Sequence, residues 1–507
     1  MLQKVTGSRM ILGIIMFFIF SSCVIKPGDT SDPEDSPRPV VDANIIIDGA
    51  RIITQSYLGN GAQWDPYQLD YGKVNLSISE ADWKKIYDRL DFMRPQVMRV
   101  MINTVSAMEG DTLNVQKGLE QLLPILEYCQ SRDVTVTFGD WGGRMVDSKA
   151  DTISERHLEY AAKYLDFLVN DKGFSCIKYY NMINEPNGFW SVTDESYTLW
   201  RDATAYFQEQ LESRGLTNKV SIMGPDIAIW DTDETDWISR TERDLGEAVG
   251  LYDIHTYPSK STVNSGEYSE IIRAYKEEAP DDVPIIMGEI GFKFVAEEDK
   301  HLNEENIVRA EAKPYASVED SQMFVYDHVY GTDMADALFQ TVNEGYSGCV
   351  VWMLDDAMHS KEERHKLKVW GFWNILGEEF FGAEEEAVRP WFYAWSLLTK
   401  YMPSGSRIIE TVREGDESVK AISLEKDGSH MLAIVNVGKE KKHIKVSFEN
   451  LPNLEGMKKF IYSEDLIITE GDHKILPNET GLKINSAESL EMEITPETLI
   501  VLTNFTY

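Results

Sequence analysis

An eightfold alternation of short apolar runs with longer helix-period stretches, between residue 55 and about residue 402, most constrains the fold. Several of the runs are continuously apolar, as strands are when both faces of a sheet are buried. No Gly-x-Gly-x-x-Gly follows the first run, so we predict a closed (β/α)8 TIM barrel rather than a doubly wound sheet. The expected strands are Tyr57–Gln63, Val97–Ile102, Val134–Gly139, Ile177–Ile183, Val220–Gly224, Tyr252–His255, Ile285–Gly288 and Cys349–Leu354.

Helix-period stretches separate these strands. Ser79, followed three residues later by Asp82, is expected to cap the first helix. Trp391 and Trp395 lie four apart in a later helical run and are expected in the core. The expected helices are Glu80–Met93, Gln116–Ser131, Ser154–Asn170, Glu195–Arg214, Tyr268–Glu278 and Gln322–Asn343.

After residue 402 the pattern changes to many short strands with turn signals, which predicts an antiparallel β-sandwich over residues 403–507. Asp427-Gly428 supplies a tight hairpin turn. The run Asn44–Thr54 also reads as a strand and is a candidate to pair with this sandwich, although it precedes the barrel, for which we set the bounds 44–402. The expected strands are Val419–Leu424, Met431–Val437, His443–Phe448, Lys459–Tyr462, Leu490–Ile494 and Leu499–Thr503.

The N-terminus reads as an export signal. Lys4 and Arg9 precede an apolar run, Met10–Phe20, that is too short to span a bilayer. Ser21-Ser22-Cys23 resembles a bacterial lipobox, which implies removal of residues 1–22 and lipidation of Cys23. The alternative is an ordinary signal peptide with an incidental cysteine.

Residues 23–43 are acidic and rich in proline, so we expect an extended tether. Together with the lipid, the tether predicts an exported protein, anchored to a bacterial membrane by lipid alone, at the cell surface or in the periplasm.

Composition excludes several other partners. The chain has 85 acidic and 49 basic residues, a formal charge of −36, so it repels nucleic-acid backbones. Its four cysteines include no Cys-x-x-Cys, and its nine histidines show no metal-ligand spacing, so we expect neither a metal site nor a cofactor. Cys129, Cys176 and Cys349 are expected to be small buried side chains. A Gly-x-Ser-x-Gly elbow is absent, which argues against an esterase.

Two glutamates end expected barrel strands. Glu185 ends the fourth strand in Asn-Glu-Pro, and Glu289 ends the seventh in Gly-Glu. Working residues of such barrels lie at the carboxyl ends of strands, so the two carboxylates should face each other across the mouth. Cleavage of a glycosidic bond needs this pair: one carboxyl group protonates the leaving oxygen, and the other attacks the sugar or activates water. Alone, either glutamate could equally be a helix cap or a solvated charge.

Further strand-end residues strengthen the pattern. Arg99 lies in the second strand, His255 and Tyr257 follow the sixth, and Trp352 lies in the eighth. With the two glutamates, these residues resemble the large clan of retaining (β/α)8 glycoside hydrolases that includes families five, thirty and thirty-nine. The resemblance spans residues 55 to about 400.

The resemblance implies roles for individual residues. Glu185 looks like the general acid/base, Glu289 like the nucleophile, and Asn184 like the partner of the sugar 2-hydroxyl. Arg99 and Tyr257 look like the groups that hold Glu289 ionised by lowering its pKa; for Arg99, a structural ion pair below the mouth is the alternative. The acid/base should have a raised pKa. We expect the carboxylates to lie about 5–5.5 Å apart, the spacing of retaining enzymes.

Aromatic residues near the expected mouth are candidates for stacking on sugar rings, although core packing is the alternative for each, and equally weighted for Trp190, Trp370 and Trp373. Aspartates that follow strands are expected to cap helices by default, with sugar binding or calcium ligation as alternatives. The aromatic candidates are Trp64, Trp141, Trp190, Trp230 and Trp352, and the aspartates are Asp140, Asp226, Asp355 and Asp356.

The sequence therefore predicts a retaining glycoside hydrolase that acts on a β-linked oligo- or polysaccharide without a cofactor. The alternative is a non-catalytic glycan-binding lipoprotein on the same scaffold, which would keep the aromatic residues and lose a carboxylate. Both glutamates are present, which favours the enzyme.

Overall fold

The computed structural model describes residues 40–507 except 68–69, 72–73, 76 and 363–365. Residues 41–507 form one compact unit. Within it, eight parallel strands close into the predicted barrel. In chain order these are β2 (Gly59–Gln63), β5 (Val97–Ile102), β8 (Thr135–Asp140), β11 (Ile177–Asn181), β12 (Ser221–Ile229), β13 (Val249–Thr256), β14 (Ile285–Ile290) and β15 (Gly348–Val351).

The first barrel strand shows why small residues occur in a buried sheet. All five residues of β2, Gly-Asn-Gly-Ala-Gln, are buried. A Cβ atom on Gly61 would lie only 1.6 Å from the carbonyl oxygen of Val97 on the neighbouring strand. Glycine is therefore required here for β2 and β5 to pair closely.

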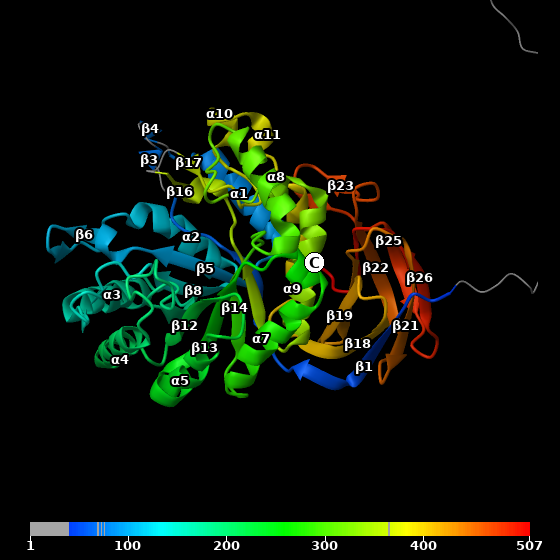
Figure 1. The fold of residues 1–507 in the computed structure, drawn as a ribbon, viewed down its shortest axis with the longest axis horizontal. Coiled ribbons are helices and arrows are strands. Elements are labelled where there is room, and N and C mark those ends of the chain that lie inside the picture. Colours follow the sequence, from blue (N-terminus) through cyan, green and yellow to red (C-terminus); the bar gives the residue numbers. More distant parts are fainter. Residues whose placement is uncertain (1–39, 68–69, 72–73, 76, 363–365) are drawn as a thin grey trace, which may run out of the picture. The chain divides into compact units, whose positions relative to one another are not determined.

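Helices surround the barrel, and the expected helices are all present (Figure 1). Ser79 and Asp82 form the predicted capping box at the start of α1. The stretch expected over 322–343 begins with a 3-10 turn, Met323–Tyr326, before its α-helix. The helices are α1 (Glu80–Met93), α2 (Leu119–Ser131), α3 (Glu155–Asp166), α4 (Tyr197–Ser213), α5 (Asp236–Leu245), α6 (Lys260–Asn264), α7 (Glu267–Glu278), α8 (Lys300–Glu311), α9 (His328–Asn343), α10 (Gly377–Phe380), α11 (Ala383–Glu386) and α12 (Pro390–Lys400).

The C-terminal part is a mostly antiparallel nine-stranded sheet in the order β25-β22-β27-β20-β19-β18-β1-β21-β26. The N-terminal strand β1 pairs antiparallel with β18 and parallel with β21, so it lies in blue among the orange strands of Figure 1. Asp427 and Gly428 have φ values of 51° and 77° in the predicted hairpin turn. The strands are β1 (Ala43–Thr54), β18 (Arg407–Gly415), β19 (Val419–Lys426), β20 (Ser429–Asn436), β21 (Lys442–Glu449), β22 (Leu454–Tyr462), β25 (Glu479–Ile484), β26 (Leu490–Ile494) and β27 (Thr498–Thr503).

Both faces of this sheet are buried: one encloses the core of the sandwich itself, and the other packs against the barrel and its helices. Successive residues of β27 alternate between two hydrophobic cores, since side chains along a strand point to opposite faces. Ile500 and Leu502 join a core enclosed by the sheet itself, whereas Leu499 and Val501 join the core of the barrel and its helices. Tyr462 of β22 donates a hydrogen bond to the carbonyl oxygen of His328 in α9 at 2.7 Å. The barrel and the sandwich therefore share one continuous core.

Several other expectations are confirmed. Trp391 and Trp395 of α12 are buried, and so are Cys129, Cys176 and Cys349. The expected signal peptide 1–22, Cys23 and the tether up to residue 39 lie outside the described residues. Among the residues that are described, none of the helices has the length and apolar character needed to cross a membrane.

Candidate active site

A cleft of about 620 Å³ lies at the carboxyl ends of the barrel strands and contains both predicted catalytic glutamates. Asn184, Tyr257 and four of the predicted sugar-stacking tryptophans also line it. Its full lining is Trp141, Asn184, Glu185, Trp190, Ser191, Val192, Trp230, Tyr257, Glu289, Lys293, Asp320, Trp352, His359, Ser360, Lys361 and Lys368.

Glu289 lies at the end of β14 and is held by two donors. Arg99 Nη1 lies 3.0 Å from Glu289 Oε2, and the hydroxyl of Tyr257 donates to Oε1. The two carboxylate oxygens are thus fixed separately, by groups from two other barrel strands or their loops. This is the arrangement that the sequence predicts for the partners of Glu289.

Glu185 follows β11 in a left-handed backbone conformation, φ 46°, that non-glycine residues seldom adopt. Its N–H donates to the carbonyl oxygen of Asp226 at 3.0 Å, which fixes this conformation. The side chain accepts from Trp190 Nε1 at 2.7 Å, and its other oxygen lies 3.2 Å from His255 Nδ1. One oxygen of Glu185 and one of Glu289 lie within 4.8 Å of each other, so the two carboxylates share a single small site.

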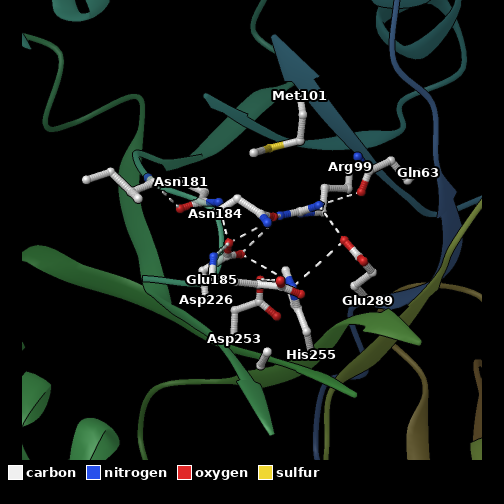
Figure 2. Close-up of polar contacts among 12 residues, drawn as sticks. Gln63, Arg99, Met101, Asn181, Asn184, Glu185, Asp226, Asp253, His255 and Glu289 are labelled. Carbon is white, nitrogen blue, oxygen red and sulfur yellow. Dashed lines mark hydrogen bonds and ion pairs between the residues drawn. The ribbon is translucent and has the colours of Figure 1, made fainter. Parts of the chain in front are cut away.

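Asp226 links Arg99 and His255, the two cationic side chains that contact the glutamates (Figure 2). Its carboxylate lies 3.2 Å from Arg99 Nη2 and 3.1 Å from His255 Nε2, and it accepts from Asn181 Nδ2 at 2.6 Å. The carboxylate is fully buried. The default expectation that Asp226 caps a helix is therefore wrong: it is the shared counterion of the two cations that touch the glutamates.

Asn184 completes this network. Its Oδ1 accepts from Arg99 Nη2 at 2.7 Å, which orients the amide so that its nitrogen remains available. Among the described residues, Asn184 Nδ2 has no hydrogen-bond partner of its own. A free donor at this position fits the predicted contact with a sugar hydroxyl.

His255 lies between carboxylates on both ring nitrogens and is completely buried. Burial opposes its charge, but the carboxylates of Asp226 and Glu289 together raise the pKa of His255 well above its usual value. Asp253, 3.6 Å from His255 Nε2, has no hydrogen-bond partner among the described residues. Burial raises the pKa of Asp253 to about 7. The imidazole is therefore a cation, and Asp253 carries a proton for much of the time at neutral pH.

The pKa directions of the two glutamates are opposite to those that the sequence predicts. Burial raises the pKa of Glu289 and outweighs the lowering by His255 and Arg99. Burial also disfavours ionised Glu185, but the hydrogen bond and charge of His255 and the bond from Trp190 lower its pKa overall. The prediction failed because burial outweighs the cations beside Glu289, whereas Glu185 faces the buried cation His255.

The tryptophans divide according to strand alternation. Trp141, Trp190, Trp230 and Trp352 line the cleft, as expected. Trp64 does not: it is fully buried, 6.3 Å from Trp83 between ring centroids. Trp64 follows Gln63, which points into the barrel towards Arg99, so the next side chain must point outwards into the helix layer.

Trp370 and Trp373 are buried, so core packing is the correct one of the two alternatives that the sequence leaves equally open for them. The remaining aspartates accept hydrogen bonds from backbone N–H groups, but of the three only Asp355 caps a helix, the 3-10 turn Asp356–Met358. Asp140 accepts from Thr104 and Gly142, Asp355 from Ala357, and Asp356 from Trp370 and Gly371.

Two groups of side chains have the spacing of metal ligands: Glu185, His255 and Glu289, and Asp226, Asp253 and His255. Arg99 already lies within 3.3 Å of Glu289 and Asp226. Since a divalent cation would meet this guanidinium at close range, neither group fits a metal ion while Arg99 is in place.

Sequence reasoning missed a second line of contacts. The side chain of Gln63 accepts a hydrogen bond from Arg99 and donates one to Asp65 at 2.7 Å. The same carboxylate of Asp65 lies 2.6 Å from His359 Nε2. Gln63 is the last residue of β2. The search for functional residues at the ends of barrel strands would have found Gln63 if it had included amides as well as acids.

Comparisons with known proteins support the fold. Neither the family models nor the curated proteins include a match to this chain. Solved structures do match: the catalytic domain of GH30 xylanase C from Talaromyces cellulolyticus has a TM-score of 0.62 at 11% identity, covering 91% of this chain and all of that one. The chain has the fold of glycoside hydrolases.

Two further neighbours agree. The endo-β1,6-glucanase BT3312 has a TM-score of 0.57 at 14% identity, covering 91% of this chain and 94% of its own. A GH39 β-xylosidase from Caulobacter crescentus has a TM-score of 0.55 at 11% identity, covering 91% and 99%. At these identities the likeness establishes the barrel-and-sandwich scaffold, and the chemistry must be argued from this chain's own residues.

Proposed function

We propose that the protein is a retaining glycoside hydrolase that cleaves β-linked glycans, with Glu289 as nucleophile and Glu185 as general acid/base. The observation that carries the proposal is that one oxygen of Glu185 and one of Glu289 lie within 4.8 Å of each other at the mouth of the barrel, a close approach that favours the retaining arrangement. An inverting enzyme needs roughly 6.5–9.5 Å between its carboxyl groups to admit a water molecule, and retaining enzymes need about 5–5.5 Å.

In this proposal, Glu289 attacks the anomeric carbon while Glu185 protonates the leaving oxygen, which gives a glycosyl–enzyme ester. Water then attacks the ester, Glu185 removes its proton, and Glu289 leaves as a carboxylate. Arg99 and Tyr257 each hold one oxygen of Glu289, so the side chain is fixed before substrate arrives. Asn184 donates from its free amide nitrogen to the sugar 2-hydroxyl.

The opposite pKa directions of the two glutamates bear on which of them is protonated before catalysis. In the free protein Glu289 binds a proton more readily than Glu185 does, which is the reverse of what the first step requires. For Glu185 to act as the acid, this order has to reverse on substrate binding, and we propose that the leaving oxygen takes the place of the Trp190 N–H at Glu185. Glu185 then loses a donor that favours its ionised form, and the proton moves to it.

A substrate screen with two matched variants tests the proposal. Purified protein is assayed on β-glucan, β-mannan, xylan, galactan and aryl β-glycosides. We expect Glu289→Ala to lose nearly all activity on every substrate. Glu185→Ala should keep turnover of aryl glycosides with good leaving groups, and azide should accelerate it. If both variants match the wild type on every substrate, or the wild type only binds glycan, the catalytic assignment fails.

We also propose that the enzyme is exported and lipid-anchored at Cys23, which the lipobox-like Ser21-Ser22-Cys23 supports. The enzyme would then act at a bacterial membrane, at the cell surface or in the periplasm, on oligo- or polysaccharides. Labelled fatty acid should enter the wild-type protein and not Cys23→Ala. Equal labelling of both would remove the anchor from the account.

A further inference from the structure

A second cavity, of about 310 Å³, adjoins the catalytic cleft on the side of β5 and α2. It shares Trp141 and His359 with the cleft, so these two rings form a partition between the two spaces. The polar residues that line the new cavity include Asn103, Ser106 and Gln121. None of these three contacts Glu185 or Glu289 in the part of the chain that the structure describes. The volume is within the range of small-ligand sites, about 300–1,000 Å³.

The partition is rigid. His359 stacks on Trp352 with 5.0 Å between ring centroids, and Trp141 meets His359 edge-on at 5.9 Å. His359 is held by Asp65 at 2.6 Å. Asp65 is joined through Gln63 to Arg99, and Arg99 binds Glu289 at 3.0 Å (Figure 2). A ligand on this wall therefore lies in a fixed position relative to the proposed nucleophile.

Several uncharged polar groups of the cavity are not engaged in hydrogen bonds. Within the part of the chain that the structure describes, four have no hydrogen-bond partner: the amide of Gln121, the hydroxyls of Ser106 and Tyr164, and Asn103 Nδ2. Tyr164 is only 4% exposed, so its ring is held in place by packing.

The charged lining residues are already engaged. Lys117 Nζ donates to the carbonyl oxygen of Met108 at 2.8 Å, and Asp65 is occupied by Gln63, His359 and the backbone of Met101. Free amide and hydroxyl groups beside an indole ring suit a hydroxyl-rich sugar ring better than an ion.

We propose that this cavity is a second sugar subsite, which takes a neutral sugar unit of the same glycan whose scissile bond lies in the cleft. The inference rests on the proposed function and narrows it. The natural substrate has to be an oligo- or polysaccharide with a neutral unit that reaches past the Trp141–His359 partition. A simple aryl glycoside fills only the cleft and leaves this binding energy unused.

The test compares Gln121→Ala with Gln130→Ala, a glutamine of the same helix whose side chain instead bonds Ser175 and the N–H of Cys176 outside the cavity. The probes are neutral gluco-, xylo- and manno-oligosaccharides of two to six units, the same sizes containing a uronate, and an aryl β-glycoside. Binding is measured by calorimetry, and kcat/KM is measured for each substrate. We expect Gln121→Ala to weaken binding of one neutral series, and to lower its kcat/KM relative to the aryl glycoside, about tenfold. Gln130→Ala should leave both unchanged.

Tyr164→Phe is the second variant, should Gln121→Ala fold poorly, and it should lower the same ratio severalfold. If neither variant changes binding or the ratio while hydrolysis proceeds, the subsite is wrong and the proposed function stands. If the variants weaken oligosaccharide binding but the wild type hydrolyses nothing, the subsite stands and the proposed function fails. Tighter binding of the uronate probes than of the neutral ones would overturn the neutral assignment.

Discussion

At the residue scale, the site is organised around shared partners rather than separate pairs. The guanidinium of Arg99 contacts Glu289, Asn184 and Asp226 at once. The carboxylate of Asp226 in turn contacts both Arg99 and His255. Because each side chain holds at least two others, no single contact can be removed in isolation. Burial nevertheless raises the pKa of Glu289 despite its ion pair with Arg99.

Asp226→Asn tests the role of Asp226 as a positioning residue. The amide keeps the size of the side chain but leaves Arg99 and His255 without their buried counterion. We expect the free energy of unfolding to fall by about 3–5 kcal/mol. We also expect activity to fall about 100-fold, because both glutamates lose support. Denaturant unfolding and kinetics measure the two effects.

The control for this variant is Asp91→Asn, which removes an exposed pair with Arg132 at 3.0 Å. Surface pairs contribute about 0.2–1 kcal/mol, so this change should be small and activity unaffected. Equal effects of the two variants would contradict the account of Asp226.

Trp190→Phe tests how the pKa of Glu185 is set. The change keeps an aromatic ring and removes the N–H that lies 2.7 Å from Glu185 Oε2. A donor to the ionised form lowers a pKa, so its loss should raise the pKa of Glu185. Since Glu185 must be protonated in the first step, the alkaline limb of the kcat/KM profile should move to higher pH. Trp230→Phe is the matched control and should leave the limb in place; an unmoved limb in Trp190→Phe would assign the indole to sugar stacking alone.

At the element scale, the order of elements and the strand-end positions were predictable, because buried parallel strands leave continuous apolar runs. Glu185, Glu289 and Arg99 followed from that rule. The role of Asp226 could not be predicted in this way. Asp140 also lies at the end of a barrel strand, yet its carboxylate only accepts hydrogen bonds from loop N–H groups. Strand β18 was also missed: much of it is exposed, and it pairs on one side with β1, which is far away in the sequence.

The capping box of α1 gives an element-scale prediction. Ser79 Oγ accepts from the N–H of Asp82 at 3.2 Å at the start of the helix. We expect Ser79→Ala to lower the free energy of unfolding by about 1 kcal/mol. Ser213→Ala, at an exposed position at the end of α4, is the control. A loss confined to Ser213→Ala would contradict the assigned start of α1.

At the scale of the whole molecule, the barrel and the sandwich should unfold together. All 12 tryptophans precede residue 400, so their fluorescence reports on the barrel. Leu499 of β27 points into the shared core. Leu499→Ala should therefore lower the stability seen by tryptophan fluorescence by about 2–5 kcal/mol, although it changes the sandwich. An unchanged fluorescence transition would show two independent folding units.

The central claim is that Glu289 forms a covalent bond with the sugar, and the stereochemistry of the first-formed product tests it most directly. One oxygen of Glu185 and one of Glu289 lie within 4.8 Å of each other, which favours direct attack by Glu289 over attack by an inverting water molecule. Proton NMR, recorded from the first seconds of hydrolysis of the β-linked substrate found in the screen, separates the two anomers before they interconvert. The account predicts that the β anomer appears first. An initial α product would show inversion and would contradict both the role of Glu289 and the proposed mechanism.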